Sequence, residues 1–490
     1  MNNSIKDCWT KKSGRYPEKI IQFGEGNFLR GFVDWQVDKM NKKADFKSSV
    51  AVVQPRANGT VYKLNDQDGL YTLFLQGIKD GEAVREHTVI EAVSRGIDPY
   101  QQYDEFLKLA ENPELRFIIS NTTEAGIAYN PEDKYTDTPP SSFPGKLTAL
   151  LYHRYMHFKG SKDKGVVIIP CELIDRNGEE LKKIVLQYAE LWKLESDFVE
   201  WLTEPTIFCS SLVDRIVPGY PKDSIKEITE ELGYEDSLIV VGEQYHLWVI
   251  EGPDWLKKEL PLEEAGLNGF IVNDMTPYRT RKVRILNGAH TALTPVSYLC
   301  GQETVGEAML DEQIGGFVRS LIFEEIIPTI DLPEEELIMY ANDIIDRFLN
   351  PYITHYVMDI SLNSISKFRT RDLPTLLEYA ERKGELPQKL VFSFCALLSF
   401  YKGKRGQDII ILRDDKEIIS FFDKQWSTVD ETRTSLYSFV TSVLGEKALW
   451  GQDLSAIESL ADTVTDYLMM METSGIRNAL QACMENKKSL

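Results

Sequence analysis

The 490-residue sequence is poor in cysteine, in positive charge and in long hydrophobic runs. Its six cysteines are scattered and form no C-x-x-C pair, which argues against a zinc ribbon and a thioredoxin-like motif. Lys and Arg number 55 against 76 Asp and Glu, a formal net charge of −21, so the basic footprint of nucleic-acid or polybasic membrane binding is missing. An anionic substrate would therefore have to be met by local cations.

Signals for targeting, for membrane insertion and for metal binding are also missing. The first residues, MNNSIKDCWTKKSGRYPEK, lack the apolar core of a secretory signal, and no run of about 18 apolar residues predicts a membrane span. The six histidines are dispersed, with no H-E-x-x-H motif. Sparse, unpaired cysteines are typical of a reducing compartment. We therefore expect a cytoplasmic protein that holds no metal and binds neither nucleic acid nor a membrane, whereas its oligomeric state is not indicated.

Strand-like and helix-like stretches alternate through the first half of the chain. Short apolar runs at 19–23, 49–53, 116–120 and 165–169 predict buried strands, and helical spacing follows residue 26 and recurs at 147–157. This alternation is typical of a parallel sheet covered by helices. Further strands are expected near Ile239 and Leu247, as an extension of the sheet.

The character of the sequence changes near residue 280, where strand signals nearly vanish. Helical stretches are predicted at 282–299, 311–326, 334–349, 373–382 and 387–401. The fold class expected is α/β: a Rossmann-type dinucleotide-binding domain with a sheet extension at residues 1–280, followed by an all-α domain at residues 281–490.

A Gly24-x-Gly26 turn directly follows the first predicted strand and opens the first helix. Gly24 permits the tight turn, and Gly26 lets the backbone approach a pyrophosphate at the helix N-terminus. We assign the turn and its neighbours Phe23, Asn27 and Phe28 to a cofactor site. The third glycine of G-x-G-x-x-G is replaced by Leu29, so a plain glycine turn between strand and helix is the alternative.

The second predicted strand ends in Val53-Gln54-Pro55-Arg56, without the acidic residue that usually accepts the ribose 2′-hydroxyl of NAD. Gln54 is able to hydrogen-bond a hydroxyl, and Arg56 is able to meet a 2′-phosphate. The residues alone therefore leave NAD and NADP both open.

The segment from Lys282 to His290 carries the strongest candidate chemistry. At about 100° per residue of an α-helix, Asn287 lies about 140° and His290 about 80° from Lys282, so the three share one broad face. A lysine of lowered pKa can protonate a developing alkoxide, an amide can hydrogen-bond the same oxygen, and a histidine can orient the lysine or hold a hydroxyl. The alternative is a solvated lysine beside a core histidine.

The strings GEGNFLRGF, SNTTEAGI, PCELIDRNG, LVDRIVPGY and KVRILNGAHTAL occur in this order. Together they resemble the polyol-specific long-chain dehydrogenases, the mannitol dehydrogenase family. The resemblance implies NAD(H), no metal, and hydride transfer between a secondary alcohol and a ketone. The family's K-x-x-x-x-N-x-x-H motif matches Lys282, Asn287 and His290, which implies that Lys282 is the general acid for reduction and that Asn287 helps to bind the carbonyl oxygen.

Two further positions match family motifs. The family's T-E-G-G motif becomes Thr123-Glu124-Ala125-Gly126. The resemblance makes Thr123 and Glu124 candidates for a cofactor contact or, for Glu124, a proton relay; the alternative is an ordinary loop carboxylate. Asp214 of the V-D-R motif matches a residue near the family's active site, and its alternative is a structural partner of Arg215.

One family motif is altered. Many members carry C-D-N where this chain has Cys171-Glu172-Leu173, so a second amide that would bind the reacting oxygen is displaced or replaced. We expect Asn177 to take over that role.

Within the family, the sequence is most similar to members that act on keto sugar acids, which implies a hexuronate or aldonate substrate. Its carboxylate calls for a fixed cation. The candidates are Lys367, Arg369 and Arg371, a compact basic cluster whose alternative is a solvated loop. The rival functions are reduction of fructuronate, oxidation of a mannitol-type polyol, and a non-catalytic NAD-binding redox sensor.

Overall fold

The computed structural model describes residues 3–10, 16–79, 81–430 and 432–485. The contacts between residues divide the chain into two compact units, Met1–Gln76 with Val84–Met275 and Gly77–Ala83 with Thr276–Leu490. The predicted division after residue 280 falls inside helix α11 (Thr276–Arg281), and it stays a prediction of where the domains divide.

The first unit is built on a six-stranded sheet in which every neighbouring pair is parallel. In spatial order its strands are β5 (Val93–Ile97), β2 (Ser49–Val53), β1 (Glu18–Phe23), β6 (Phe117–Ser120), β7 (Val167–Pro170) and β8 (Ile207–Phe208). This is the doubly wound order, in which strand addition switches direction between β1 and β6. The predicted Rossmann-type sheet is therefore confirmed.

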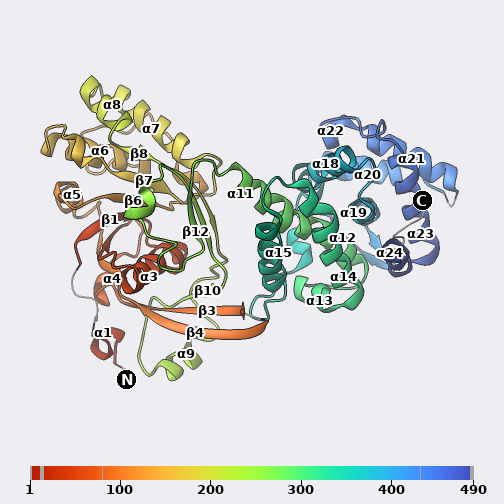
Figure 1. Cartoon of the computed structure of the whole chain (residues 1–490), viewed down its shortest axis with the longest axis horizontal. Helices are drawn as coiled ribbons and strands as arrows, with labels where there is room; N and C mark the ends of the chain where they lie inside the picture. The colour runs from red at the N-terminus through yellow and green to blue at the C-terminus, as the bar shows by residue number, and fades with distance from the viewer. Residues whose placement is uncertain (1–2, 11–15, 80, 431, 486–490) are drawn as a thin grey trace. The chain divides into compact units, whose positions relative to one another are not determined.

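Alternate residues of each strand enter two separate cores, one on each face of the sheet. Ile20 packs with the continuous helix formed by α2 (Asn27–Leu29), η1 (Arg30–Asp34) and α3 (Trp35–Lys43). Ile21 packs on the opposite face. That face is covered by α5 (Tyr103–Lys108), α6 (Phe143–His157), α7 (Asn177–Leu191) and α8 (Ser196–Thr203) (Figure 1). Burial on both faces explains why the strands lack the alternation of polar and apolar residues that a half-exposed strand shows.

The remaining strands of this unit form two three-stranded sheets. Their members are β10 (Val240–Glu243), β3 (Tyr71–Lys79) and β4 (Glu82–Ile90), and then β12 (Gly269–Val272), β11 (Leu247–Glu251) and β9 (Ser210–Asp214). β10 and β11 are the strands expected near Ile239 and Leu247. The shorter helices are α1 (Ile5–Cys8), α4 (Tyr62–Asp66), α9 (Ile225–Leu232) and α10 (Leu256–Glu259).

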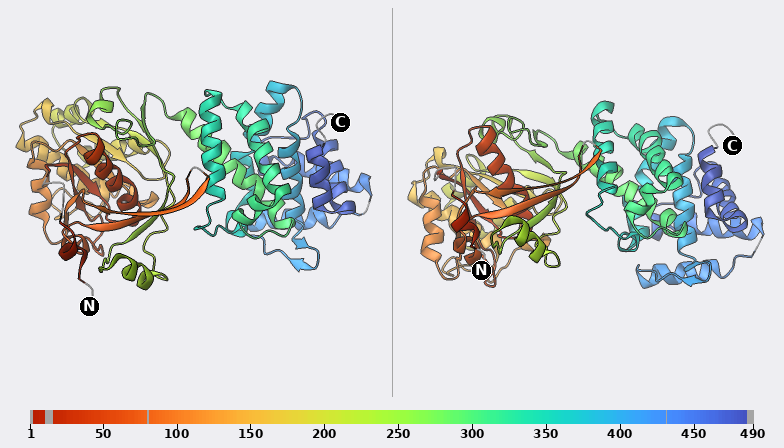
Figure 2. Two further views of the ribbon diagram at one scale, coloured as in Figure 1. Left: turned by 60° about the horizontal axis from the view of Figure 1, so that its bottom comes forward. Right: turned by 90° about the horizontal axis from the view of Figure 1, so that it is seen from below.

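The second unit includes the ends of β3 and β4 at Gly77–Ala83. From Thr276 onward, the regular structure in the described part of the chain is helical apart from the two-residue strands β13 (Lys404–Arg405) and β14 (Asp408–Ile409) (Figure 2). Its helices after α11 are η5 (Lys282–Gly288), α12 (Ala289–Leu299), α13 (Val305–Leu310), α14 (Glu312–Ser320), η6 (Leu321–Ile326), α15 (Glu334–Phe348), α16 (Val357–Ile360), α17 (Ser364–Arg371), α18 (Leu373–Lys383), α19 (Gln388–Phe400), α20 (Lys416–Trp426), α21 (Arg433–Gly445), α22 (Lys447–Trp450), α23 (Leu460–Ser474) and α24 (Ile476–Glu485). The expected all-α domain is confirmed.

Helix α19 forms the centre of the second unit. It contacts α12, α23 and α24, and its residues Leu390–Leu398 are buried all round. A helix that is apolar on every side belongs in a core rather than at a surface. No helix among the described residues has the length and apolar character needed to cross a bilayer.

Candidate functional site

The glycine turn joins β1 to the first helix at the switch point of the sheet. Gly24 has a φ of +122°, and its N–H donates to the Val53 carbonyl at 3.0 Å. A Cβ on Gly24 would lie 2.7 Å from the Asn121 carbonyl oxygen, so only glycine fits. A Cβ on Gly26 would meet no atom within 4 Å. The open space beside Gly26 is what the close approach of a pyrophosphate requires.

The two glycines are therefore expected to respond differently to alanine. Gly24→Ala should lower the free energy of unfolding by about 1–3 kcal/mol, because it forces a side chain into a positive φ and against a carbonyl. Gly26→Ala should leave unfolding by urea almost unchanged and weaken dinucleotide binding. Equal losses of stability in the two variants would contradict this assignment.

The residues around the turn support it with their side chains. Phe23 is buried, with its ring 5.0 Å from that of Phe143, and Phe28 stacks on Phe32 at 5.1 Å. The Asn27 amide oxygen accepts from Arg30 Nη2 at 2.7 Å. The side chains of Phe23 and Asn27, which we assigned to a cofactor site, therefore make contacts within the protein that stabilise the turn. Arg30, which no motif in the sequence singles out, also donates from Nε to the Glu25 carbonyl at 3.1 Å.

Gln54 directly follows β2. Its side chain is buried, its Nε2 donates to the Ala57 carbonyl at 3.4 Å, and its Oε1 accepts from Val61 N at 3.4 Å. The amide closes the loop after β2, and a contact with the ribose stays a prediction. Arg56 is exposed and donates from Nη2 to Thr123 Oγ1 at 3.3 Å.

The loop after β6 is held by a buried carboxylate that sequence analysis treated only as a departure from the family pattern. Glu172 Oε1 accepts from Thr122 N at 2.9 Å and from Thr122 Oγ1 at 3.0 Å, and its Oε2 accepts from Ser120 Oγ at 3.0 Å. Burial raises the pKa of Glu172, and these hydrogen bonds oppose the rise. The next two residues, Thr123 with a φ of 75° and Glu124, follow these hydrogen bonds and are exposed on the surface.

Replacing Glu172 with alanine should lower the free energy of unfolding by about 1–3 kcal/mol for each buried donor left unpaired. Glu172→Gln should retain most of the stability, because an amide oxygen still accepts from Thr122. Urea unfolding of the two variants measures the difference. Similar losses in both would show that the hydrogen bonds to Thr122 are not what holds the loop.

Asn177 also requires a correction. Its side chain is fully buried, and Nδ2 donates to the carbonyls of Pro170, Glu172 and Ser211 at 3.0, 3.0 and 3.1 Å. Its Oδ1 accepts from Ser211 N at 2.8 Å. The amide is used entirely by the protein, because it ties α7 to the ends of β7 and β9. It is not available to a reacting oxygen.

Asp214 is the last residue of β9 and is buried, opposite Leu247 of β11. Its neighbour Arg215 donates to the carbonyls of four residues, Gly31, Glu243, Gln244 and Tyr245. Burial lowers the pKa of Arg215 to about 9. Arg215 therefore anchors the backbone around β10 and β11, and a substrate contact by Asp214 stays a prediction.

In the second unit, Lys282 and Asn287 lie on a π-helical segment, η5, and not on the α-helix assumed from the sequence. A π-helix closes i→i+5 hydrogen bonds, so residues five apart lie one turn from each other. Lys282 and Asn287 have this spacing, and both are half-buried. Single π turns are frequent at functional sites. Among the described residues, none hydrogen-bonds to the Asn287 side-chain amide.

The arginines beside Lys282 in sequence are directed to other partners. Arg281 is buried, pairs with Glu336 at 2.5 Å and lies 4.3 Å from the centre of the Tyr340 ring. Arg284 Nη1 donates to the Thr329 carbonyl at 2.6 Å. These contacts fix the π turn against α15 and the segment after η6.

His290 follows on α12 in a cationic environment. Its ring stacks on Phe348 at 4.1 Å and meets His355 edge-on at 5.1 Å. Burial lowers the pKa of His290 well below its usual value, and His355, Arg347, Arg371 and Lys367 lower it further. The imidazole is therefore neutral, and the positive charges around it can receive an anion.

The basic cluster of α17 divides between two faces of the helix. Lys367 and Arg371, four residues apart, lie on the side of His290, and Arg371 Nη1 donates to Thr291 Oγ1 at 3.3 Å. Burial lowers the pKa of both. Arg369 is exposed and lines a separate cavity of about 480 Å³ together with Glu417 and Glu446. The structure thus brings Lys367 and Arg371, but not Arg369, to the proposed catalytic residues.

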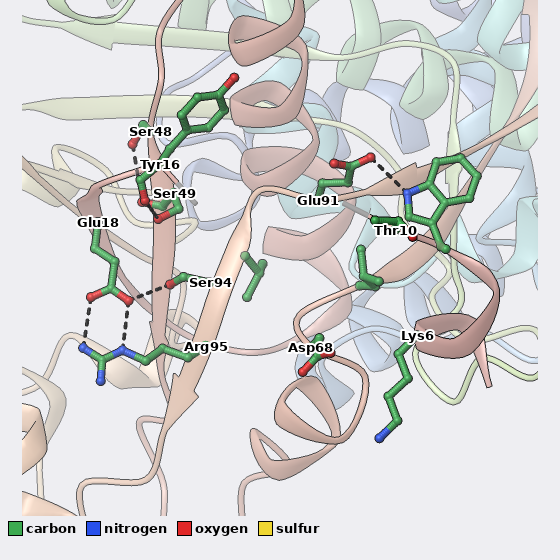
Figure 3. Close-up of a pocket in the computed structure, with 13 residues that line it drawn as sticks. Lys6, Thr10, Tyr16, Glu18, Ser48, Ser49, Asp68, Glu91, Ser94 and Arg95 are labelled. Carbon is green, nitrogen blue, oxygen red and sulfur yellow. Dashed lines mark hydrogen bonds and ion pairs between the residues drawn. The ribbon is translucent and has the colours of Figure 1, made fainter. Parts of the chain in front are cut away.

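A second cavity, of about 940 Å³, opens at the amino ends of β1, β2 and β5 (Figure 3). Across it Glu18 and Arg95 form a two-point ion pair at 2.9 and 3.0 Å, and the Trp9 indole donates to Glu91 at 3.0 Å. Nucleotides bind parallel sheets at the carboxyl ends of the strands. This cavity is therefore at the wrong edge for the cofactor.

No group of three or more His, Cys, Asp or Glu side chains able to hold a metal ion occurs in the described part of the chain. Even the i, i+4 pair His153 and His157 offers no site there, and His153 Nε2 instead lies 2.9 Å from Glu111 Oε1.

Comparisons with known proteins agree with this organisation. The family model described as the mannitol dehydrogenase Rossmann domain matches residues 18–264, and that of the mannitol dehydrogenase C-terminal domain matches residues 274–472. The chain is 56% identical over 481 residues to the altronate oxidoreductase of Bacillus subtilis (strain 168), covering 98% of this chain and 97% of that protein. It is 50% identical over 468 residues to the altronate oxidoreductase of Yersinia enterocolitica serotype O:8 / biotype 1B, covering 95% and 97%.

Solved structures share the fold. A substrate-free D-sorbitol dehydrogenase superposes with a TM-score of 0.77 at 21% identity, covering 98% of this chain and 100% of that one. A Pseudomonas fluorescens mannitol 2-dehydrogenase, solved as a ternary complex with NAD and D-mannitol, superposes with a TM-score of 0.63 at 21% identity, covering 97% and 96%. The two family models and the half-identical relatives show that this chain belongs to the mannitol dehydrogenase family.

Proposed function

We propose that this chain is an NAD(H)-dependent, zinc-independent oxidoreductase that reduces the ketone of tagaturonate to the secondary alcohol of altronate, reversibly, in hexuronate catabolism. One structural observation carries the proposal: the Lys282–Asn287 π turn leads into His290, beside the cations Lys367 and Arg371. A proton donor near a cationic pair suits a keto sugar acid better than a neutral polyol. The names of the half-identical relatives support the same substrate.

The glycine turn fits a dinucleotide. Gly26 leaves open space where a pyrophosphate would approach, and the first N–H groups of the helix from Asn27 are able to donate to it. Thr123 and Glu124 are exposed after β6, which is the neighbour of β1 in the sheet, and this position supports a contact with the nicotinamide half. When bound, the nicotinamide supplies or accepts the hydride.

Lys282 supplies the proton. In the direction of reduction its ammonium group donates to the ketone oxygen as negative charge develops there, and in oxidation the neutral amine takes the proton back. The Asn287 amide donates a hydrogen bond to the same oxygen, because no described residue occupies it. His290 is neutral, so it is able both to accept and to donate a hydrogen bond to a substrate hydroxyl.

Lys367 and Arg371 bind the substrate carboxylate. Arg371 is half-buried and held by Thr291, which limits the side-chain freedom lost on binding. Lys367 Nζ donates to the Ile360 carbonyl at 2.7 Å, so it too is fixed. Arg369 faces elsewhere and takes no part in this proposal.

The alternatives fit less well. A mannitol-type polyol offers no anion to Lys367 and Arg371. A redox sensor that only binds NAD has no need of a proton donor at Lys282. Fructuronate carries the same carboxylate as tagaturonate, so only an assay with both separates them.

The test is the oxidation of NADH, followed by the loss of its near-ultraviolet absorbance, with tagaturonate as substrate. Fructuronate, fructose and NADPH serve as controls; NADPH is included because Arg56 offers a cation where no acidic residue ends β2. We expect turnover with tagaturonate and NADH. Turnover only with fructuronate or fructose would show that tagaturonate is not the substrate. Binding of NADH without any turnover would favour the alternative of a non-catalytic NAD-binding redox sensor.

A further inference from the structure

A buried polar cluster lies beneath the glycine turn. Asp34, at the end of η1, and Gln22, on β1, both have fully buried side chains. Gln22 Nε2 donates to the Gly24 carbonyl at 3.1 Å and lies 3.5 Å from Asp34 Oδ2. Tyr71 OH lies 3.2 Å from Asp34 Oδ2 and 2.8 Å from the Arg30 carbonyl. One amide, that of Gln22, thus joins the turn to a buried carboxyl group.

Two oxygens in this cluster have no hydrogen-bond partner among the residues that the structure describes. They are Asp34 Oδ1 and Gln22 Oε1, both of which are buried. Both are acceptors while Asp34 is ionised, so neither can satisfy the other. A proton on Asp34 Oδ1 turns that oxygen into a hydrogen-bond donor. The Gln22 amide, whose Oε1 is the other unpaired oxygen, already approaches the Asp34 carboxyl group through its Nε2. A protonated Asp34 therefore suits the cluster better than a carboxylate does.

The charged surroundings do not remove this preference. Burial raises the pKa of Asp34 to about 7, against the opposing effects of Gln22, Tyr71 and Arg30. Arg30 is the cation on the same helix, but it is also acted on by Asp236 and Glu25, and it donates to the Leu238 carbonyl and to Asn27. Asp38, one turn further along the helix, is buried and pairs with Lys42. Burial thus favours the protonated form of Asp34 near neutral pH.

We propose that Asp34 and Gln22 are positioning residues that hold the dinucleotide-binding turn in its binding form only while Asp34 carries a proton. The inference rests on the proposed binding of a dinucleotide at Gly24 and Gly26. Loss of the proton draws the Gln22 amide toward the carboxylate and away from the Gly24 carbonyl. It also places a negative charge beneath the site of the pyrophosphate. Both effects weaken binding, so affinity falls as pH rises.

The test is the dissociation constant of NADH, measured by titration of its fluorescence between pH 6 and pH 8.5. If only the protonated form binds, about a tenth of the wild-type protein is competent one pH unit above its midpoint, so the constant should rise about tenfold between pH 6 and pH 8. Asp34→Asn, which keeps a donor and an acceptor and cannot ionise, should bind like the wild type at pH 6 and show a flat profile.

Asp38→Asn is the matched control, because Asp38 is a buried carboxylate on the same helix that is paired with Lys42 and makes no contact with Gln22. It should retain the pH dependence. Gln22→Met keeps the volume and removes the link, so it should bind weakly even at pH 6. A flat wild-type profile, or a sloping one in Asp34→Asn, overturns the inference while leaving the proposed function in place. No NADH binding by the wild type at any pH overturns both.

Discussion

The Lys282→Ala variant is expected to lose about 10²–10⁴-fold in kcat for tagaturonate reduction, the usual contribution of a positioned general acid. KM for tagaturonate should change little, because the proton is transferred only in the transition state. The dissociation constant of NADH should be unaffected, since the glycine turn binds it. Steady-state rates and an NADH titration together measure this split between kcat and binding.

Two further variants separate acid chemistry from charge. Lys282→Arg keeps a positive charge, but a guanidinium holds its proton far more tightly than an ammonium group does, so this variant should be nearly as slow as Lys282→Ala. Lys383→Ala, an exposed lysine at the end of α18, should match the wild type. A Lys282→Ala protein with native melting behaviour and more than about a tenth of the wild-type kcat would remove Lys282 from the proton transfer.

The fold was largely predictable because its signals are local. The apolar runs of β1 and β2 have no polar alternation, since Ile20 and Ile21 enter cores on opposite faces of the sheet. Such a pattern is typical of a parallel sheet covered on both faces when helices alternate with the strands. The helix predicted at 387–401 is likewise found as α19.

The site was less predictable because its geometry depends on contacts distant in sequence. The Asn177 amide hydrogen-bonds to the Pro170 and Ser211 carbonyls, and no pattern in the sequence around α7 predicts these partners. The π turn at Lys282 was likewise not predictable, because a helical wheel assumes the residue spacing of an α-helix. The division of the basic cluster was within reach, because residues four apart on a helix share a face and residues two apart do not. The prediction from sequence instead treats as one compact cluster all three residues, Lys367, Arg369 and Arg371.

That division makes Arg371→Ala the second large expected effect. Removing a charged hydrogen bond to the substrate carboxylate costs about 1.5–3 kcal/mol, so KM for tagaturonate should rise about 10–150-fold. KM for fructose, which has no carboxylate, should change by less than about threefold, since its binding makes no use of this charge. Steady-state kinetics with both substrates give the comparison.

Arg369→Ala is the control within the same helix. Arg369 carries the same charge two residues away, yet it is exposed and lies with Glu417 and Glu446. Its removal changes the net charge equally, so any effect of long-range attraction on substrate capture should appear in both variants and vanish at high salt. The local contact should appear only in Arg371→Ala and persist. Equal rises in KM for tagaturonate in the two variants, or an equal rise for fructose in Arg371→Ala, would place the carboxylate elsewhere.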